Sequence, residues 1–401
     1  MLRGRARLRR LARALRVARP FALLLAASCG GEGDVVSEPP LAAREPDLEA
    51  LRAIGYADLG GRPEPAEAAG ASPAEPALVA PGLNVYADEV DRVLALDADG
   101  RTVHAWRIPG RSQVEHALPL GGGRLLAVSV DQGVTAVDAD SRVLWSRDLN
   151  AHHDVARAAN GTFLVPVWKE REYRGRRVRF DQLVRLDPSG ERLGAWDTFE
   201  HLDELQRLHP PLALDRAAPP AAGDDAIYDY YHLNTVAPVP PNALGDDARF
   251  RAGNLVLCFR NANLIVILER DTHELVWSYR PGTLDMPHTP RVLPTGTLLI
   301  FDNGRHRGWS RVIEVDPRDG RTVWSWQADP RPDFFSDVRG SCQRLSNGNT
   351  LICESERGRA FEVAPAGDVV WELVNPLERG GRPRRMYRFL RYSEAELFGP
   401  R

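Results

Sequence analysis

Three histidines stand at the beginning of β-rich runs in this sequence: His153, His232 and His288. His153 and His288 each lie eight residues before a turn glycine, so they share a position relative to that turn. Arg260 ends a further apolar run at 255–259. A neutral imidazole is a nucleophile and proton acceptor near pH 7, and a guanidinium binds anions. The four side chains therefore favour chemistry on an anionic group.

A structural role competes with this interpretation, because a single histidine at the start of a strand is more often a hydrogen-bonded core residue. Three at corresponding positions, with an arginine among them, favour function. Three histidines are also a zinc ligand set. The charge of Arg260 would repel a cation, however, so we expect no metal. His152 and His153 are neighbours in an expected strand and should face opposite ways, so they should not bind one ion together.

Other polar residues are expected near the histidines. Asn234 follows His232 by two positions, should face the same way, and is a candidate for orienting an imidazole or binding substrate. Glu115 and Asp302 are candidate acids. His116 begins the second blade, but two extra residues in its turn leave its facing open. Five further histidines fall in expected outer hairpins or loops and are predicted to lie on the surface: His104, His201, His209, His273 and His306.

The stretch 285–304, DMPHTPRVLPTGTLLIFDNG, predicts a β-hairpin with two apolar runs joined by a Pro-Thr-Gly turn. The start of the first strand and the end of the second lie at the same end of an antiparallel pair. His288 should therefore lie beside Asp302. The same argument places Arg260 at the same end as His232.

This hairpin belongs to a repeat that decides the fold class. Six units pass from an Asp- or Pro-containing turn through a β-rich run to a tryptophan: Trp106, Trp145, Trp196, Trp277, Trp324 and Trp371. The shortest separations, 39 and 47 residues, match a four-stranded propeller blade. We predict an all-β fold, a six-bladed β-propeller of four-stranded antiparallel sheets, with the tryptophans packed between adjacent sheets.

An inner hairpin should precede each tryptophan unit and line the central channel. Five are visible, at 115–128, 152–167, 231–260, 285–304 and 341–353. The first blade lacks one, and we expect the run 386–390 to supply it and close the ring. Insertions at 199–230 and 241–252 explain the longer repeats. One channel mouth should then gather the three histidines and Arg260.

The propeller should occupy residues 81–376, followed by a tail at 377–401. Residues 1–28 predict an export signal, because eight arginines and no acid precede an apolar run far shorter than the ~20 residues of a membrane span. That run ends at Cys29 in a pattern similar to a bacterial lipobox, which predicts a lipidated, exported protein, periplasmic or anchored to the outer membrane. An ordinary cleaved signal is the alternative. Residues 29–80 should be a tether and linker with a short helix.

The formal net charge of -3 hides an acidic mature chain. Without residues 1–28, 44 basic residues stand against 55 acidic ones. Binding to phosphates requires a basic face, so nucleic acid is not an expected partner.

The cysteine spacing permits a disulfide. Cys342 and Cys353 are equally distant from the Asn347-Gly348 turn. A two-residue loop would pair them across the hairpin with a Cα separation of ~5.5 Å, which suits a bridge in an exported protein. Free thiols are the alternative. Cys258 would remain a buried thiol.

Several catalytic motifs are missing from the sequence: GxxxxGK[ST], GxSxG and HExxH. Their absence argues against a nucleotide-activated donor, a serine hydrolase of the GxSxG type and a zinc protease. We expect no cofactor.

Several segments resemble the bacterial arylsulfotransferase (aryl-sulfate sulfotransferase) family of exported six-bladed propellers. They are YHLNTV, the strand end at Arg260, PHTPRVLPTGTLLIFDNG and QRLSNGNTLI…GRAFEV…GDVVWEL. The resemblance covers about residues 81–376 and is densest from 231 to 371. It implies that a histidine attacks a phenolic sulfate ester, becomes a sulfohistidine and passes the sulfuryl group to a phenol without a nucleotide donor.

Position by position, the resemblance suggests His288 as the nucleophile. His232 and Arg260 would bind the sulfuryl oxygens, and His153 would assist by proton transfer or charge stabilisation. The expected partners are then an aryl sulfate and a phenol, with membrane contact only through a lipid anchor.

Two other classes stay open at this point. One is a non-catalytic exported propeller that serves as a binding or assembly scaffold. The other is a quinoprotein-like repeat protein, because the units also resemble the tryptophan-docked repeats of quinoprotein dehydrogenases. Those rings usually have eight blades and bind a metal through acidic residues, which the sequence does not offer.

Overall fold

The computed structural model describes residues 71–73, 76–214, 227–379 and 381–399. The chain divides into two compact units, 1–44 and 45–401, and all described residues belong to the second. The expected export signal, Cys29 and most of the expected linker lie outside the described residues. No helix in the described ranges is long and apolar enough to cross a membrane.

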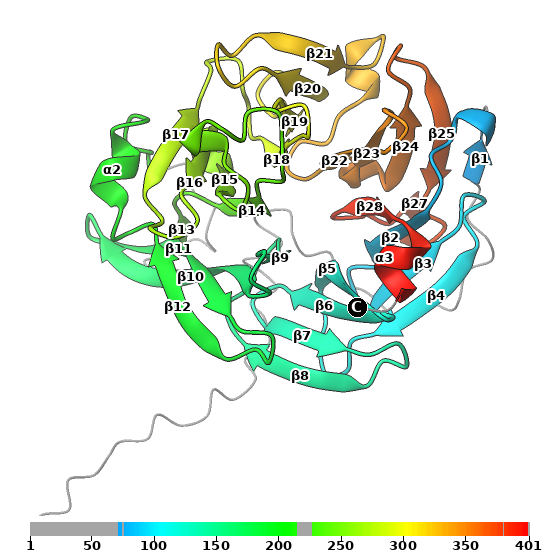
Figure 1. The fold of residues 1–401 in the computed structure, drawn as a ribbon, viewed down its shortest axis with the longest axis horizontal. Coiled ribbons are helices and arrows are strands. Elements are labelled where there is room, and N and C mark those ends of the chain that lie inside the picture. The colour runs from blue at the N-terminus through cyan, green and yellow to red at the C-terminus, as the bar shows by residue number, and fades with distance from the viewer. Residues whose placement is uncertain (1–70, 74–75, 215–226, 380, 400–401) are drawn as a thin grey trace, which may run out of the picture. The chain divides into compact units, whose positions relative to one another are not determined.

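Six antiparallel sheets stand around a common centre in the second unit, so the predicted six-bladed propeller is confirmed (Figure 1). From the innermost strand outward, the sheets are β28 (Phe389–Tyr392), β2 (Leu83–Ala87), β3 (Arg92–Leu96), β4 (Thr102–Arg107); β5 (Val114–Gly121), β6 (Arg124–Ser129), β7 (Gly133–Val137), β8 (Val143–Asp148); β9 (Ala156–Arg157), β10 (Phe163–Tyr173), β11 (Arg176–Leu186), β12 (Arg192–Asp197); β14 (Leu233–Pro238), β15 (Leu255–Phe259), β16 (Leu264–Leu268), β17 (Leu275–Tyr279); β18 (His288–Val292), β19 (Leu298–Asp302), β20 (Arg311–Val315), β21 (Thr322–Trp326); and β22 (Ser341–Arg344), β23 (Thr350–Glu354), β24 (Arg359–Val363), β25 (Val369–Val374).

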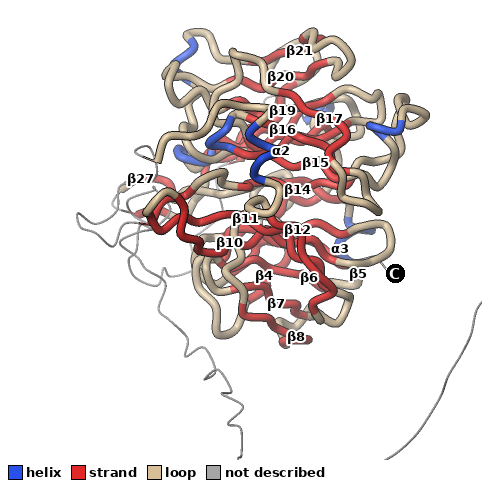
Figure 2. Tube along the Cα trace, turned by 90° about the vertical axis from the view of Figure 1, so that its left-hand side faces the viewer, coloured by secondary structure: helices blue, strands red, loops and turns tan. Residues whose placement is uncertain are grey.

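Short elements decorate this ring. β1 (Ala71–Pro73) pairs with β25, β13 (Ile227–Asp229) pairs in parallel with β11, and β26 (Glu378–Arg379) pairs with β27 (Arg382–Pro383). The helical segments are η1 (Pro76–Leu78), α2 (Leu202–Gln206), η2 (Ala248–Phe250), η3 (Arg260–Ala262), η4 (Arg331–Asp333), η5 (Ser355–Arg357) and α3 (Glu394–Phe398). The ends of β10 and β11 extend beyond the ring on the same side as β27 (Figure 2).

The repeated tryptophans join neighbouring blades. In four of the six, the indole N–H donates to a carbonyl in the outer turn of the next blade, as Trp145 does to Pro188 O at 3.1 Å. Trp371 donates to Ala98 O at 2.7 Å, which links the sixth blade to the first. Trp106 instead reaches Gly123 O in the next blade's inner turn. The tryptophans pack between adjacent sheets, as predicted. Both apolar burial and the repeated hydrogen bond from the indole N–H to the next blade stabilise this packing.

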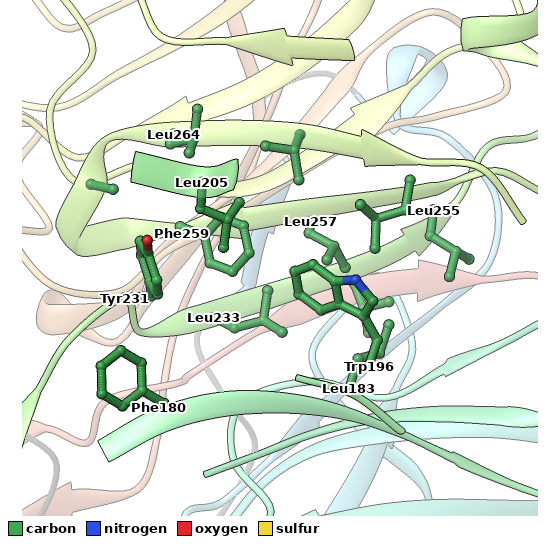
Figure 3. Close-up of a cluster of buried hydrophobic side chains, with 14 of the residues drawn as sticks. Phe180, Leu183, Trp196, Leu205, Tyr231, Leu233, Leu255, Leu257, Phe259 and Leu264 are labelled. Atoms are coloured by element: carbon green, nitrogen blue, oxygen red, sulfur yellow. The ribbon is translucent and has the colours of Figure 1, made fainter. Parts of the chain in front are cut away.

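Six buried apolar clusters lie between adjacent sheets, one at each blade boundary. Figure 3 shows the cluster between the third and fourth sheets, where Phe180, Leu183 and Trp196 face Leu233 and Leu257. Within the ring, the second and third strands of the sheets are buried on both faces and are largely apolar, as in LVLCF of β15 and LIVIL of β16, whereas the inner strands carry more polar residues. Burial contributes roughly 25 cal/mol per Å² of apolar surface, which makes these boundaries the main source of the fold's stability.

The ring is closed by a strand from the end of the chain. β28 pairs with β2 in antiparallel register, with Leu83 opposite Tyr392 and Tyr86 opposite Phe389. The strand begins three residues later than the expected run at 386–390. The first sheet therefore combines one strand from the C-terminal tail with three from the first blade.

A buried ion pair crosses the centre of the ring just before β28. Arg388 Nη1 lies 2.6 Å from Asp154 Oδ1, and Nη2 donates to Asn234 O at 2.7 Å. The second carboxylate oxygen of Asp154 accepts from Val236 N at 2.9 Å. Arg291 Nη2 stands 3.7 Å from the same oxygen. These contacts tie the closing strand to the third, fourth and fifth blades.

The disulfide that the spacing permits between Cys342 and Cys353 is not formed, and free thiols, the alternative, are found. Both thiols are free and buried, and the register pairs Cys342 with Ile352 and Ser341 with Cys353. The turn has an odd number of loop residues, because Leu345 N donates to Asn349 O. Equal spacing from the Asn-Gly pair therefore places the two cysteines on opposite faces of the hairpin. Cys258 is a free buried thiol, as the sequence predicts.

Replacement of Arg388 should destabilise the propeller strongly. Arg388→Ala leaves the buried carboxylate of Asp154 without its nearest cation, a loss expected to cost about 3–5 kcal/mol in the free energy of unfolding. Denaturant titration measures this cost. Arg249→Ala removes a guanidinium that is 46% exposed and pairs with Asp247, and should cost less than about 1 kcal/mol. Equal losses in the two variants would contradict the role given to Arg388.

Candidate functional site

Two of the predicted site histidines are in direct contact. The ring centroids of His153 and His232 lie 4.6 Å apart, and both side chains are buried. Both residues have left-handed backbone, with φ of 66° and 58°. Such conformations are costly for residues other than glycine and concentrate at functional sites. Both imidazoles lie at the end where the inner strands begin, which we call the mouth.

His288 lies at the same mouth, at the first position of β18 opposite Phe301. Its Nδ1 is 2.7 Å from Asn303 Oδ1 and 3.1 Å from Met286 O. The amide nitrogen of Asn303 donates to Ser336 O and Arg339 O, both at 2.6 Å, and this fixes the orientation of the amide. Asn303 therefore presents its oxygen to the imidazole.

These contacts fix the tautomer of His288. Both groups facing Nδ1 are acceptors, so Nδ1 carries the proton and Nε2 carries the lone pair. Nε2 is buried and has no hydrogen-bond partner among the described residues. Burial and the nearby charge of Arg260 lower the pKa of His288 to about 3. The ring is neutral at physiological pH, with one available lone pair.

Arg260 is the cation shared by this cluster. Its backbone N–H donates to His232 O at 3.2 Å, and its Nε donates to Asn261 Oδ1 at 3.1 Å. Burial lowers the pKa of His153 and of His232 well below the usual value, and the guanidinium of Arg260 adds to this effect at both. The predicted grouping of three imidazoles and one guanidinium at one mouth thus corresponds to the observed geometry.

Glu115 supports His153 from the second blade. Glu115 Oε2 lies 3.0 Å from His153 Nδ1, and both groups are buried. Burial raises the pKa of Glu115 to about 8, against the opposing influence of Arg339. At neutral pH the carboxyl group therefore holds a proton and donates it to Nδ1. His153 then carries its own proton on Nε2. Tyr387 stacks on this ring at a centroid distance of 5.3 Å.

Asp229 supports His232 from the opposite side. Its Oδ2 forms a short hydrogen bond with His232 Nδ1, and burial raises the pKa of the carboxyl group. Asp229 is the last residue of β13, which pairs with Arg177, Val178 and Arg179 of β11. The orientation of His232 thus depends on the extended hairpin of the third blade.

Two expected positions behave differently. Asn234 donates its amide to Pro287 O at 2.9 Å and joins two blades instead of orienting an imidazole. Asp302 is committed to ion pairs with Arg307 and Arg311, each at 2.8 Å. The candidate acid at this mouth is therefore Glu115.

His152 and His153 do not face opposite ways, contrary to the expectation from strand alternation. Their rings lie 4.6 Å apart at 90°, because the left-handed backbone of His153 breaks the strand. His152 Nε2 stands 3.1 Å from Asp181 Oδ1. Within the described ranges, no group of three or more His, Cys, Asp or Glu side chains is arranged to hold a metal ion. His209, expected at the surface, is buried beside Tyr231.

Three residues that support the site were not predicted as site residues: Asp229, Tyr387 and Arg388. Tyr387 and Arg388 come from the tail and reach the mouth only because β28 closes the ring. Asp229 lies three residues before His232, and that spacing is the one signal that could have identified it. Asn303, by contrast, belongs to the Asp-Asn-Gly end of the hairpin that contains His288.

The fold and this cluster define a six-bladed propeller with a buried histidine–arginine centre at one mouth. A family model described as arylsulfotransferase matches residues 118–376, about two thirds of the chain. The chain therefore belongs to the arylsulfotransferase family, as the motifs predicted. A model described as outer membrane protein assembly factor BamB matches residues 57–171, less than a third of the chain.

No curated protein sequence matches the chain. Solved structures with a similar course of the backbone include a protein of unknown function from Bacteroides caccae, with 13% identity, a TM-score of 0.49, and coverage of 77% of this chain and 98% of that one. A streptogramin B lyase has 12% identity, a TM-score of 0.44, and coverage of 76% and 82%. BamB from Moraxella catarrhalis has 11% identity, a TM-score of 0.33, and coverage of 73% and 72%. Similarity at this level carries no argument about function.

The neutral state of His288 makes stability depend on pH. Its folded pKa of about 3 lies below the unfolded value of about 6.5, so the unfolded chain binds more protons between these values. Stability should fall as the pH falls through that window, by about 2 kcal/mol at pH 5 from this group. Unfolding free energies of the wild type and His288→Asn measure it, and their difference should shrink in acid. Parallel pH profiles would contradict a neutral His288.

Proposed function

We propose that this protein transfers a sulfuryl group from an aryl sulfate ester to a phenolic acceptor through a sulfohistidine at His288. The observation that carries the proposal is the deprotonated Nε2 of His288, which has no hydrogen-bond partner among the described residues and lies in the cluster with Arg260 and two further imidazoles. A neutral imidazole held in one tautomer is a prepared nucleophile. Membership of the arylsulfotransferase family supports the reaction class.

In the first half-reaction, Nε2 of His288 attacks the sulfur, a nitrogen–sulfur bond forms, and the sulfur–oxygen bond to the aryl group breaks. The attack gives the imidazole ring a positive charge. The oxygen of Asn303 and the carbonyl of Met286 accept from Nδ1–H and stabilise that charge. Arg260 and His232 would bind the sulfuryl oxygens, whose negative charge a guanidinium and an imidazole N–H compensate.

The departing phenolate needs a proton. His153 Nε2–H can donate it while the proton of Glu115 moves to Nδ1, so that the pair ends with a carboxylate and a neutral imidazole. In the second half-reaction an acceptor phenol loses its proton to Nε2 of His153, and the proton on Nδ1 of His153 returns to Glu115. The phenol oxygen attacks the sulfur, a new oxygen–sulfur bond forms, and the nitrogen–sulfur bond to His288 breaks. His288 returns to its starting state and no nucleotide is consumed.

Loss of the nucleophile should abolish transfer. With a chromogenic aryl sulfate and a phenol, we expect His288→Ala to lower kcat/KM at least about 10³-fold. Without acceptor, intact-mass measurement should find one added sulfuryl group per wild-type chain and none in the variant. His306→Ala removes a side chain that is 66% exposed and should leave both results unchanged.

Absence of turnover and of the covalent adduct with every donor and acceptor would contradict the proposal. That outcome would favour a non-catalytic assembly scaffold, the class to which the partial match to the BamB model points.

The proton relay predicts a dependence on the leaving group. Glu115→Gln keeps a hydrogen-bonding side chain but cannot pass a proton to His153. We expect a loss of about 10²-fold or more for donors with weakly acidic phenols and little loss for nitrophenyl donors. A plot of log kcat/KM against the pKa of the leaving phenol should steepen in the variant. An equal loss with all donors would indicate a structural role for Glu115.

A further inference from the structure

The hairpin of β10 and β11 carries a concentration of positive charge. Its outer part, residues 168–179, is called the basic arm here. It contains six basic residues and two acidic ones: Lys169, Arg171, Arg174, Arg176, Arg177 and Arg179, with Glu170 and Glu172. The tip, Arg174 to Arg177, is exposed. The rest of the mature chain is acidic, so the arm differs in sign from most of the protein.

The tip arginines are paired with aromatic rings more than with acids. Arg174 stands over the ring of Tyr173 at 5.0 Å, and Arg176 stands over Tyr228 at 5.1 Å and donates to its hydroxyl. Neither forms an ion pair with the acids of the described ranges, whereas Arg177 pairs with Glu170. Guanidinium groups beside tyrosine rings suit a ligand that is both anionic and aromatic.

The arm is physically joined to the mouth. Its β11 residues pair with β13, and β13 ends in Asp229, the partner of His232. A series of aromatic contacts runs the same way: Tyr173 to Tyr230 at 5.7 Å and Tyr230 to Tyr231 at 4.7 Å. Tyr231 is next to His232 in the chain.

The arm also projects from the side of the ring where the histidines lie. β10 runs antiparallel to β9, so its far end lies at the end where the inner strand of that blade begins. Figure 2 shows this end extending past the ring. An anion approaching the mouth therefore meets the field of the arm, and a cluster of one sign can raise its rate of arrival by 10-fold or more.

We propose that the basic arm selects aryl sulfates that bear a second anionic group, by binding that group and the aromatic ring at the tip. This inference rests on the proposed function for the identity of the reacting group. It adds a substrate class, aromatic polyanions, and a site for the part of the donor that does not react. An anionic lipid surface is the competing ligand for the arm. It is less favoured because the arm pairs with β13, whose last residue, Asp229, contacts His232.

The test uses a tip variant, Arg174→Gln/Arg176→Gln/Arg177→Gln. Its exposed side chains contribute little to stability, so the variant should fold. The matched control, Arg101→Gln/Arg142→Gln/Arg318→Gln, removes the same charge from three arginines that are 67%, 73% and 62% exposed on the outer turns of other blades. Circular dichroism and thermal melts check both.

Binding is measured first, in a His288→Ala background that needs no turnover. The probe is a fluorescent aryl trisulfonate, compared with an aryl monosulfonate. We expect the tip variant to weaken trisulfonate binding about tenfold at low salt, the control to leave it unchanged, and added salt to remove the difference. The monosulfonate should change less.

The next step measures kcat/KM in proteins that retain His288. The two donors are a monoanionic aryl sulfate and the same ester bearing an added carboxylate. The tip variant should lower kcat/KM mainly for the dianion. Equal trisulfonate binding by wild type and tip variant, or an equal loss in the control, would overturn the inference. Tip-dependent binding to vesicles containing anionic lipid, without competition by the trisulfonate, would overturn it in favour of a membrane. Tip-dependent trisulfonate binding without any sulfuryl transfer would refute the proposed function alone.

Discussion

The ion pair between Arg388 and Asp154 is the interaction on which the site depends. A charge buried at the centre of a ring is tolerated only when it is paired and hydrogen-bonded. Asp154 meets this requirement with backbone N–H groups of its own blade and the next one, and with two guanidinium groups. Although burial works to raise it, these cations hold the pKa of Asp154 below its usual value. These contacts fix the position of Asp154, and they therefore also position its neighbour His153 and the start of the inner strand β9.

Burial prepares the mouth beside this pair, and the charge of Arg260 adds to its effect. Burial keeps the imidazoles of His153, His232 and His288 neutral, and each has one nitrogen fixed by a different partner: Glu115, Asp229 and Asn303. One side chain therefore offers a lone pair and another offers a proton without either being ionised. In water the same groups would exchange protons with the solvent and lose these separate roles. The fold keeps the proton-accepting and proton-donating roles on separate histidines, because each histidine has its own hydrogen-bond partner from a different part of the ring.

Much of this arrangement could be predicted from the sequence, because a repeat fixes phase. The turn glycines and tryptophans locate every blade, and a histidine at a given distance before a turn must lie at a known end. This is why the sequence predicts His153, His288 and Arg260 at one mouth of the channel. Orientation could not be predicted where the backbone leaves the strand, as at His153, whose left-handed φ turns it toward His152.

The strand register of the hairpin that contains Cys342 and Cys353 could not be predicted for a similar local reason. The loop has one residue more than the two-residue loop that would pair the cysteines, so Cys353 lies on the face opposite Cys342. The number of loop residues cannot be read from the amino-acid composition of the turn. Contacts between segments that lie far apart in the sequence could not be predicted either. Arg388 and Asp154 are 234 positions apart, and nothing in either local sequence identifies the other.

The position of β28 has a consequence for the order of assembly. Leu83 pairs with Tyr392, so the first sheet stays incomplete until the more than 300 residues between its strands have been made. Closing a loop of that length carries an entropic cost that local hairpins do not meet. During synthesis the five other blades can form in turn, but the pocket gains Tyr387 and Arg388 last. Under the proposed function, a newly made chain cannot transfer a sulfuryl group until β28 has docked, so activity would report that the ring is closed.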